Sequence, residues 1–244
     1  MSHKEHIAVF LNQSLKDIRN PADPEGIVFN KAGFTKQQDF IDEVLFTKMH
    51  HATEIIWRDT AEFWDKSFDP TEGMWQRHRQ ILPYALLSKR INGVKMYGVY
   101  QRVKGIGETR LLKGHTMGFG GHLPGIDVKY DKHSGIDVIR SIIAGLGGEL
   151  MQEAHVDLND IGHVSHRFHG YIMADTNEVD ALHFAFVMEV EVDEDYPVVV
   201  DEKGLAFKGW YSKEGIMHMH ETLPVDVKFE NWTRFIIEAG VLED

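Results

Sequence analysis

Residues 145–156 read Gly-Leu-Gly-Gly-Glu-Leu-Met-Gln-Glu-Ala-His-Val, an apolar segment in which two carboxylates stand four positions apart. The pattern is typical of a helix, where the side chains of residues i and i+4 lie on one face. Glu149 and Glu153 are therefore predicted to point towards one spot. Like charges held this close repel each other, so the pair is a candidate binding site for a hard divalent cation. The alternative is a solvated helix face, where glutamate pairs at this spacing are also common.

A glycine-dense loop precedes the carboxylate pair. Residues 118–127 read Gly-Phe-Gly-Gly-His-Leu-Pro-Gly-Ile-Asp, and a longer, partly hydrophilic stretch follows before the helix. This order of glycine loop, acidic residue and glutamate-bearing helix resembles the signature of the Nudix (MutT-like) hydrolases. In that resemblance Gly121 stands at the opening glycine, Asp127 at the first acidic position, and residues 148–153 at the Arg-Glu-apolar-x-Glu-Glu core.

The resemblance extends over roughly residues 75–215. Blocks that resemble a phosphoesterase branch of the superfamily, in the right order, are residues 79–84, 100–102, 107–111, 118–123, 170–172, 176–179 and 183–184. Several ordered blocks are more specific than one glycine loop. The resemblance therefore implies the fold of the family, an α/β/α sandwich with a mixed sheet.

The same resemblance implies site residues and a reaction. The implied metal ligands for Mg²⁺ or Mn²⁺ are Glu149, Glu153, Gln152 and Asp127, the catalytic residues are Glu149, Glu153 and Glu178, and the substrate contacts are Gly120, Gly121, His122, Arg102 and Tyr130. The implied reaction is the attack of water on a phosphorus atom of a nucleoside diphosphate linked to another group. For Glu178 a solvated loop carboxylate, and for His122 a structural role, are about equally good interpretations.

Tyr130 belongs to a polar segment, residues 128–135, that interrupts the box. Loops beside an active site commonly shape specificity, so we expect this segment to border the substrate pocket, with Tyr130 available to stack on a base. The alternative is a tolerated surface insertion that points away from the site.

Three departures from the family pattern bear on activity. Gly148 replaces the arginine that braces the glutamates in the family, Gln152 replaces an acidic ligand, and the interval between loop and helix is long. A glutamine carbonyl oxygen can still coordinate a hard cation, but it brings no charge. A catalytically silent Nudix domain that binds a nucleotide or a protein is therefore the alternative function.

Composition bounds the class of protein. The 244 residues are 43% hydrophobic and include 26 basic and 38 acidic residues, for a net charge of −12. Such an anion is repelled by nucleic-acid backbones, so no duplex binding is expected. The absence of cysteine excludes disulfides and thiolate metal sites, and no apolar run is long enough to cross a membrane. We expect a cytoplasmic protein.

A change in the hydrophobic pattern along the chain predicts two regions. Residues 1–75 are predicted to be an N-terminal helical extension, because residues 35–68 have apolar positions at helical spacing. Its aromatic residues Trp57, Phe63, Trp64 and Trp75 suggest a partner-binding arm, so a homo-oligomer or an assembly protein is a further possibility. Residues 76–244 are predicted to be the Nudix-like domain, with strands at 81–87, 94–103, 168–173, 183–192 and 205–210 and a last helix at 225–239.

Histidines and acidic residues cluster in the C-terminal half. His163, His166 and His169 recur at every third position, without a cysteine or a His-Glu-x-x-His pattern beside them. A transition-metal site is therefore disfavoured against hydrogen-bonded or surface histidines. The acidic run at 189–195 is interpreted as the solvated end of a hairpin.

Overall fold

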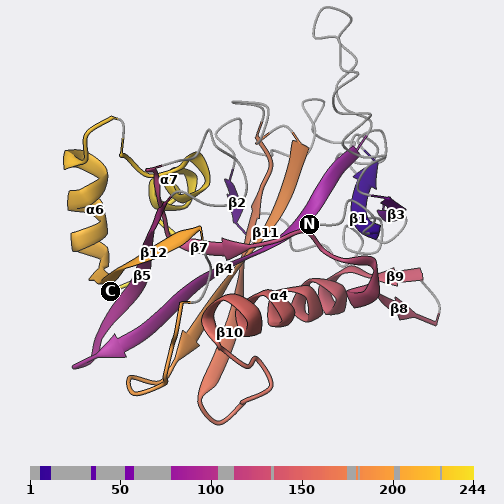
Figure 1. Ribbon diagram of the computed structural model, residues 1–244, viewed down its shortest axis with the longest axis horizontal. Helices are drawn as coiled ribbons and strands as arrows, with labels where there is room; N and C mark the ends of the chain where they lie inside the picture. Colours follow the sequence, from indigo (N-terminus) through magenta and orange to yellow (C-terminus); the bar gives the residue numbers. More distant parts are fainter. Residues whose placement is uncertain are drawn as a thin grey trace, which may run out of the picture. The chain divides into compact units, whose positions relative to one another are not determined.

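The computed structural model describes residues 6–11, 34–36, 53–57, 78–103, 113–132, 135–174, 180, 182–200, 204–225 and 227–244. These residues form an α/β fold (Figure 1). One sheet has the strand order β12-β5-β4-β11-β10-β2, with β1, β3, β6 and β7 paired off this path, and β8 and β9 form a separate two-stranded sheet. No helix among the described residues is long and apolar enough to cross a membrane.

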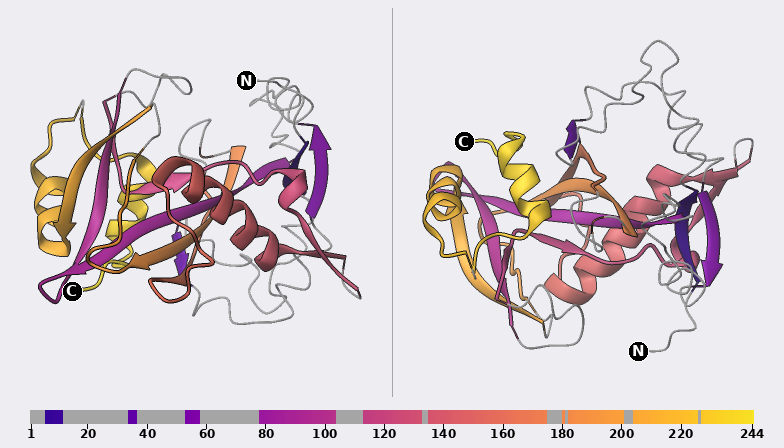
Figure 2. Two further views of the ribbon diagram at one scale, coloured as in Figure 1. Left: turned by 60° about the horizontal axis from the view of Figure 1, so that its bottom comes forward. Right: turned by 90° about the horizontal axis from the view of Figure 1, so that it is seen from above.

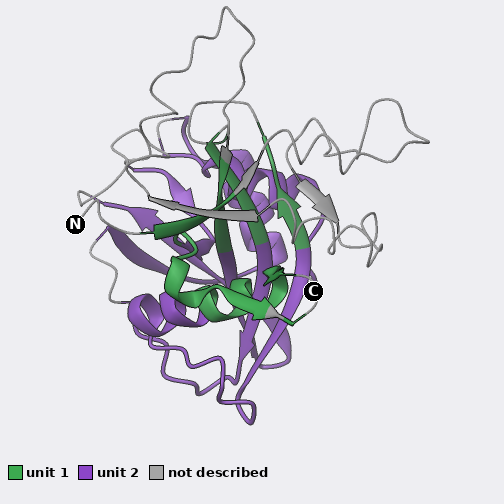
Figure 3. Cartoon of the chain, turned by 90° about the vertical axis from the view of Figure 1, so that its right-hand side faces the viewer, with its two compact units in different colours: residues 1–83, 121–146, 170–186 green, residues 84–120, 147–169, 187–244 purple. Residues whose placement is uncertain are grey.

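The chain divides into two compact units (Figure 3). Unit 1 comprises residues 1–83, 121–146 and 170–186, and unit 2 comprises residues 84–120, 147–169 and 187–244. Four elements contribute residues to both units: β4 (His78–Ile91), β10 (Val164–Ile172), β11 (His183–Val192) and α4 (Val138–Ala154). Each unit is described by itself below.

Unit 1 contains the first strand and the start of α4. β1 (His6–Leu11) pairs antiparallel with β3 (Thr53–Trp57) and with the first residues of β4. The short strands β8 (Lys129–Asp131) and β9 (Gly135–Asp137) form a hairpin at the N-terminal end of α4 (Figure 2). The Asp137 carboxylate accepts the backbone N–H of Arg140 at 3.0 Å, and so satisfies a donor in the first turn of α4.

The helical prediction for residues 35–68 is wrong wherever the structure describes this segment. Residues 34–36 form β2, which pairs with β10, and residues 53–57 form β3. β3 reads Thr-Glu-Ile-Ile-Trp, a run of mainly β-branched and aromatic residues, and its pairing with β1 outweighs the helical spacing of the longer window. Phe63, Trp64 and Trp75 lie outside the described residues, so the partner-binding arm and the boundary near residue 75 stay predictions.

Unit 2 is built on a hairpin between β4 and β5 (Val94–Arg102). Asn92 and Gly93 both have positive φ, 51° and 81°, the conformation of a two-residue turn that matches the twist of the strands. β12 (Leu205–Ser212) pairs with the other edge of β5, with a register shift between Phe207 and Gly209. The structure confirms the five strands predicted at 81–87, 94–103, 168–173, 183–192 and 205–210. Each observed end lies within four residues of the predicted one.

Two helices close unit 2. The predicted terminal helix at 225–239 is α7, but it spans only Asn231–Glu238, because residues 227–230 are bonded along β6 (His115–Thr116). The sequence did not predict α6 (Lys213–Thr222), which follows β12 directly (Figure 2). Ser212 is its N-cap, accepting the backbone N–H of Gly215 at 3.3 Å.

A buried ionic cluster joins the four strands β4, β5, β10 and β11 to the C-terminal residues. The Glu189 side chain is 2% exposed, and one of its oxygens accepts from Ser88 at 2.6 Å and Lys95 at 2.5 Å. The other accepts from Arg167 at 2.9 Å and His169 at 2.8 Å. Lys95 and Arg167 also pair with Glu243, at 3.6 and 3.0 Å. The acidic run at 189–195 therefore begins with a structural carboxylate, and not with a solvated one.

This cluster predicts a loss of stability in acid. Burial alone would raise the pKa of Glu189, but the hydrogen bonds from His169, Lys95, Ser88 and Arg167 hold that pKa well below its usual value of 4.5. A carboxyl whose folded pKa is lowered stabilises the protein above its unfolded pKa, and this contribution is lost as the pH falls below about 4.5. We expect the urea midpoint to fall over that range in the parent and to fall less steeply in Glu189→Gln. Equal slopes in the two proteins would contradict the assignment.

Candidate functional site

α4 carries both predicted carboxylates in a continuous helix. Glu149 and Glu153 are half-buried, one turn apart on one face, while Leu146, Leu150 and Ala154 are fully buried. The helix ends where His155 takes a left-handed conformation, φ 56°, and the N–H of Val156 returns to the Leu150 carbonyl at 3.1 Å. The shared face of the pair is confirmed, and its role in metal binding stays a prediction.

The glycines before the pair lie in the middle of the helix, because α4 begins at Val138. At Gly145 an added Cβ would stand 2.7 Å from Leu123 Cδ1 and 3.3 Å from Pro83 Cγ, closer than carbon atoms pack. Gly145 therefore lets the helix approach the loop that carries Leu123. At Gly147 the nearest atom would be 3.7 Å away, on Leu158, which is an ordinary contact. The two glycines thus have different physical roles.

A pair of substitutions separates these roles. Gly145→Val should destabilise the protein by about 1–3 kcal/mol, because the branched side chain overpacks against Leu123 and Pro83. Gly147→Ala should stabilise it by up to about 1 kcal/mol, because alanine has the higher helix propensity and has room. Urea unfolding of both variants measures the difference. Similar effects at the two positions would show that close packing does not explain Gly145.

Arg102, a predicted substrate contact, is held by a carboxylate that the sequence did not single out. Its Nε donates to Glu230 Oε1 at 2.6 Å. Glu230 immediately precedes α7, and β6 fixes it there: the N–H of Glu230 donates to the His115 carbonyl at 2.9 Å, and the N–H of His115 donates to the Lys228 carbonyl at 3.1 Å. No motif marks Glu230, because it lies more than a hundred residues from its partner and only the sheet brings them together.

Burial and charge act together around this pair. Burial is the largest influence on Glu230 and raises the pKa of its carboxyl, which Arg102 and Thr116 partly offset. Burial alone would lower the pKa of Arg102, but the carboxylates of Glu230 and, more weakly, Glu153 raise it. Arg102 therefore stays a cation, with acidic residues of two different elements acting on it.

The predicted site residues in the glycine loop and in the segment after it differ in exposure. Gly120 is exposed at the end of β7 (Gly118–Gly120), where it pairs with Tyr84 of β4. His122 is half-buried, with its ring centroid 5.6 Å from that of His183. Asp127 is half-buried in the short 3₁₀ helix η3 (Gly125–Asp127), and Tyr130 is 65% exposed on β8.

The predicted site residues fall into both units. Arg102, Gly120, Glu149, Gln152 and Glu153 belong to unit 2, and Gly121, His122, Asp127 and Tyr130 belong to unit 1. Glu178 lies outside the described residues. Where the chain is described, no three histidine or acidic side chains are grouped so as to hold a metal ion. Glu149 and Glu153 are half-exposed and Gln152 is exposed, and all three carry side-chain oxygens of the kind that coordinate Mg²⁺. These three residues could therefore supply part of the ligand set of such an ion.

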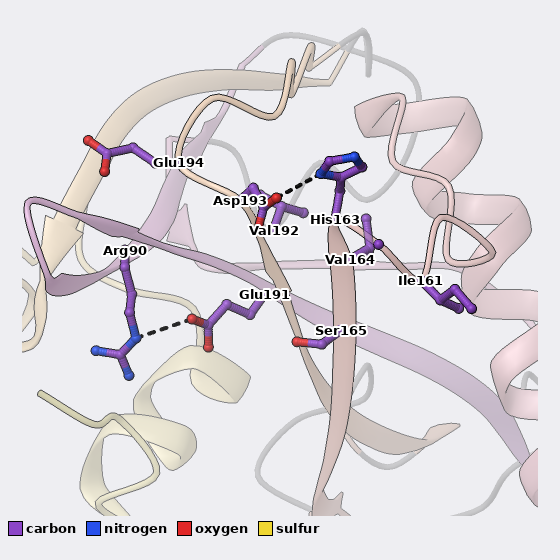
Figure 4. Close-up of a pocket in the computed structure, with 10 residues that line it drawn as sticks. Arg90, Ile161, His163, Val164, Ser165, Glu191, Val192, Asp193 and Glu194 are labelled. Atoms are coloured by element: carbon purple, nitrogen blue, oxygen red, sulfur yellow. Dashed lines mark hydrogen bonds and ion pairs between the residues drawn. The ribbon is translucent and has the colours of Figure 1, made fainter.

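The histidine triplet has protein partners at two of its three positions. His169 binds the buried Glu189, and His163 Nδ1 lies 2.7 Å from Asp193 Oδ2, a hydrogen bond that raises the pKa of His163. A hollow of about 380 Å³ beside His163 is lined by Ser165, Asp193 and the Arg90–Glu191 ion pair (Figure 4). It contains none of the predicted site residues, and four of its charged or titratable side chains form the pairs Arg90–Glu191 and His163–Asp193.

These elements, in this order, form the Nudix fold. The structure matches that of Tm1382, a candidate Nudix hydrolase, with a TM-score of 0.62 over 97% of this chain and 98% of that chain, at 16% sequence identity. The Bacillus subtilis (strain 168) protein YmaB is 24% identical over 217 residues, which are 88% of this chain and 93% of YmaB. No family model matches the sequence. The predicted α/β Nudix-like fold is thus confirmed, and the activity is a separate question.

Proposed function

We propose that this protein is a Nudix-type hydrolase that cleaves a phosphoanhydride bond in a nucleoside diphosphate linked to another group. The observation that carries the proposal is the pair Glu149 and Glu153, half-exposed on one face of α4 in a chain with the Nudix fold. Two carboxylates kept at partial exposure can hold a hard cation without the cost of a fully buried charge. The proposed substrate is therefore a small anionic nucleotide.

Each residue then has a defined task. Glu149 and Glu153 would hold Mg²⁺ or Mn²⁺, with Gln152 as a neutral oxygen donor, and Asp127 or Glu178 would complete the ligand set or accept a proton from water. Bound there, the ion would neutralise phosphate charge and lower the pKa of a coordinated water. Gly120 and Gly121 would let the substrate approach the backbone closely, and His122 and Tyr130 would contact the phosphate and the base.

The second candidate is a Nudix-fold module that binds a nucleotide without hydrolysing it. Gly148 and the exposed Gln152 favour it, since each stands where a charge would assist the glutamates. Both candidates predict that the protein binds a nucleotide in the presence of a divalent ion. They differ in whether phosphate is released.

A turnover screen decides between them. Nucleoside diphosphate compounds would be incubated with the protein after chelator treatment, and then with Mg²⁺ or Mn²⁺ restored, and the products would be separated by chromatography. Hydrolysis that requires the added ion supports the enzyme. Ion-dependent nucleotide binding by calorimetry with no hydrolysis of any compound would select the silent module, and neither binding nor hydrolysis would refute both.

A further inference from the structure

One face of the strand pair β5–β12 in unit 2 carries an exposed aromatic ring. Phe207 of β12 is 42% exposed, and it is in register with Tyr100 of β5, which is fully buried. The two ring centroids are 5.6 Å apart, so both side chains lie on the same face of the pair. Because β12 is the end strand of the sheet order, Phe207 lies at an edge of the sheet (Figure 1).

A β-bulge gives this ring a second aromatic neighbour. Residues 207 and 210 are three positions apart and would point to opposite faces of a regular strand. The register of β12 shifts between Phe207 and Gly209, and this shift brings Trp210 to the face of Phe207. The ring centroids of Phe207 and Trp210 are 5.7 Å apart, with their planes at 68°. Tyr100 and Trp210 therefore support an exposed ring that is already ordered before any ligand packs on it.

A guanidinium group stands on the same face. Arg102 follows Tyr100 by two residues in β5, and it is in register with Leu205, which precedes Phe207 by two residues in β12. Side chains two residues apart in a strand share a face. Arg102 and Phe207 are thus diagonal neighbours on that face, and the Cα atoms of such neighbours are roughly 7–8 Å apart.

The guanidinium of Arg102 is anchored, yet most of its donors are available. Its Nε donates to Glu230 Oε1 at 2.6 Å, while the Arg102 side chain is 36% exposed. No residue that the structure describes accepts from its two terminal nitrogens, which carry four of the five N–H groups. A chain with a net charge of −12 repels anions in general, so an anionic ligand needs a fixed local cation of this kind.

We propose that this face of β5 and β12 binds a nucleotide, with the base stacked on Phe207 and a phosphate bound by the terminal nitrogens of Arg102. A nucleotide carries both groups that the face can recognise, a flat aromatic base and an anionic phosphate, joined by one sugar. Stacking on an aromatic side chain tolerates every base, so Phe207 contributes affinity for a nucleotide without selecting among bases. The assignment gives Phe207 the stacking role predicted for Tyr130. That the bound nucleotide is a substrate rests on the proposed function, whereas its binding to unit 2 does not.

Calorimetry with two probes tests the base and the phosphate separately. ADP carries both groups, inorganic pyrophosphate carries only the phosphates, and both are titrated in the presence of Mg²⁺. Phe207→Leu keeps an apolar side chain but removes the ring, so it should weaken ADP binding at least fivefold and leave pyrophosphate binding within twofold. Arg102→Gln removes the cation, so it should weaken the binding of both probes at least fivefold.

Two further variants make the result specific. Phe207→Tyr retains a ring and should bind ADP within twofold of the parent. Met217→Leu alters an apolar residue of α6 that is 38% exposed, and it should change neither affinity. Equal losses for ADP and pyrophosphate in Phe207→Leu, or no loss for either probe, would overturn the stacking role. An ADP-specific loss that occurs in Tyr130→Ala alone would overturn it as well.

The same measurements separate this site from the proposed function. If the parent binds ADP in this way but hydrolyses no nucleotide, the hydrolase proposal fails and the site on β5 and β12 stands. If the parent hydrolyses a nucleotide and Phe207→Leu retains both its KM and its affinity for ADP, the site fails and the hydrolase proposal stands. A parent that neither binds ADP nor hydrolyses a nucleotide would overturn both.

Discussion

Glu189→Gln is expected to lower the free energy of unfolding by about 3–5 kcal/mol, among the largest effects of any single substitution in unit 2. The Glu189 carboxylate is 2% exposed and accepts from four side chains, and Lys95, one of the four, is itself 4% exposed. A glutamine keeps the shape but removes the charge. Lys95 and Arg167 would then face a neutral amide, and the buried Lys95 would lose the nearest of its counterions, which is costly even though Glu191 and Glu243 remain beside it.

Urea unfolding followed by fluorescence measures this loss. Glu194→Gln is the matched control, because Glu194 is exposed just beyond the end of the same strand, β11, and its substitution should change the free energy by about 0.5 kcal/mol or less. A loss of under about 1 kcal/mol in Glu189→Gln would show that the cluster does not stabilise the fold. The Glu243 contacts predict in addition that the C-terminal residues become susceptible to carboxypeptidase in this variant.

The double variant Glu149→Gln, Glu153→Gln should lose hydrolysis by about 10³-fold, which is about 4 kcal/mol of transition-state stabilisation. Both side chains are half-buried on α4, and glutamine preserves their size and helix propensity. The fold should therefore survive, and the loss should come from the missing charge. Steady-state kinetics with Mg²⁺, together with metal titration by calorimetry, measures both parts of the prediction.

Two comparisons make this result specific. Glu221→Gln, an exposed glutamate on α6, should hydrolyse substrate at the parent rate. Circular dichroism and the Tm of the double variant should match those of the parent within a few degrees. Undiminished turnover in the double variant, with its fold intact, would place the active site elsewhere in the chain.

The sequence by itself determined the elements whose signals are local. The apolar segment around Glu149 and Glu153 predicted a helix with both carboxylates on one face, and runs rich in Val, Tyr and Phe predicted the five principal strands after residue 76. Such patterns need only the geometry of a single element. The same reasoning failed at residues 53–57, where five residues with strong β propensity lie inside a window with helical spacing and pair with a strand some forty-five residues away.

Only the tertiary structure decided which charges meet. Glu230 reaches Arg102, and Glu189 reaches Lys95, Arg167 and His169, because sheet pairing brings together residues that the chain separates by twenty to more than a hundred positions. A pattern along the chain carries no record of such pairs. Gly145 shows the same limit. Along the chain a glycine inside a helix indicates only a loss of helix propensity, whereas the structure shows that an added Cβ would meet the side chain of Leu123. The sequence thus predicted two carboxylates on one face of a helix, and long-range packing decided which charged side chains pair in the sheet, because electrostatic partners are chosen by distance in space.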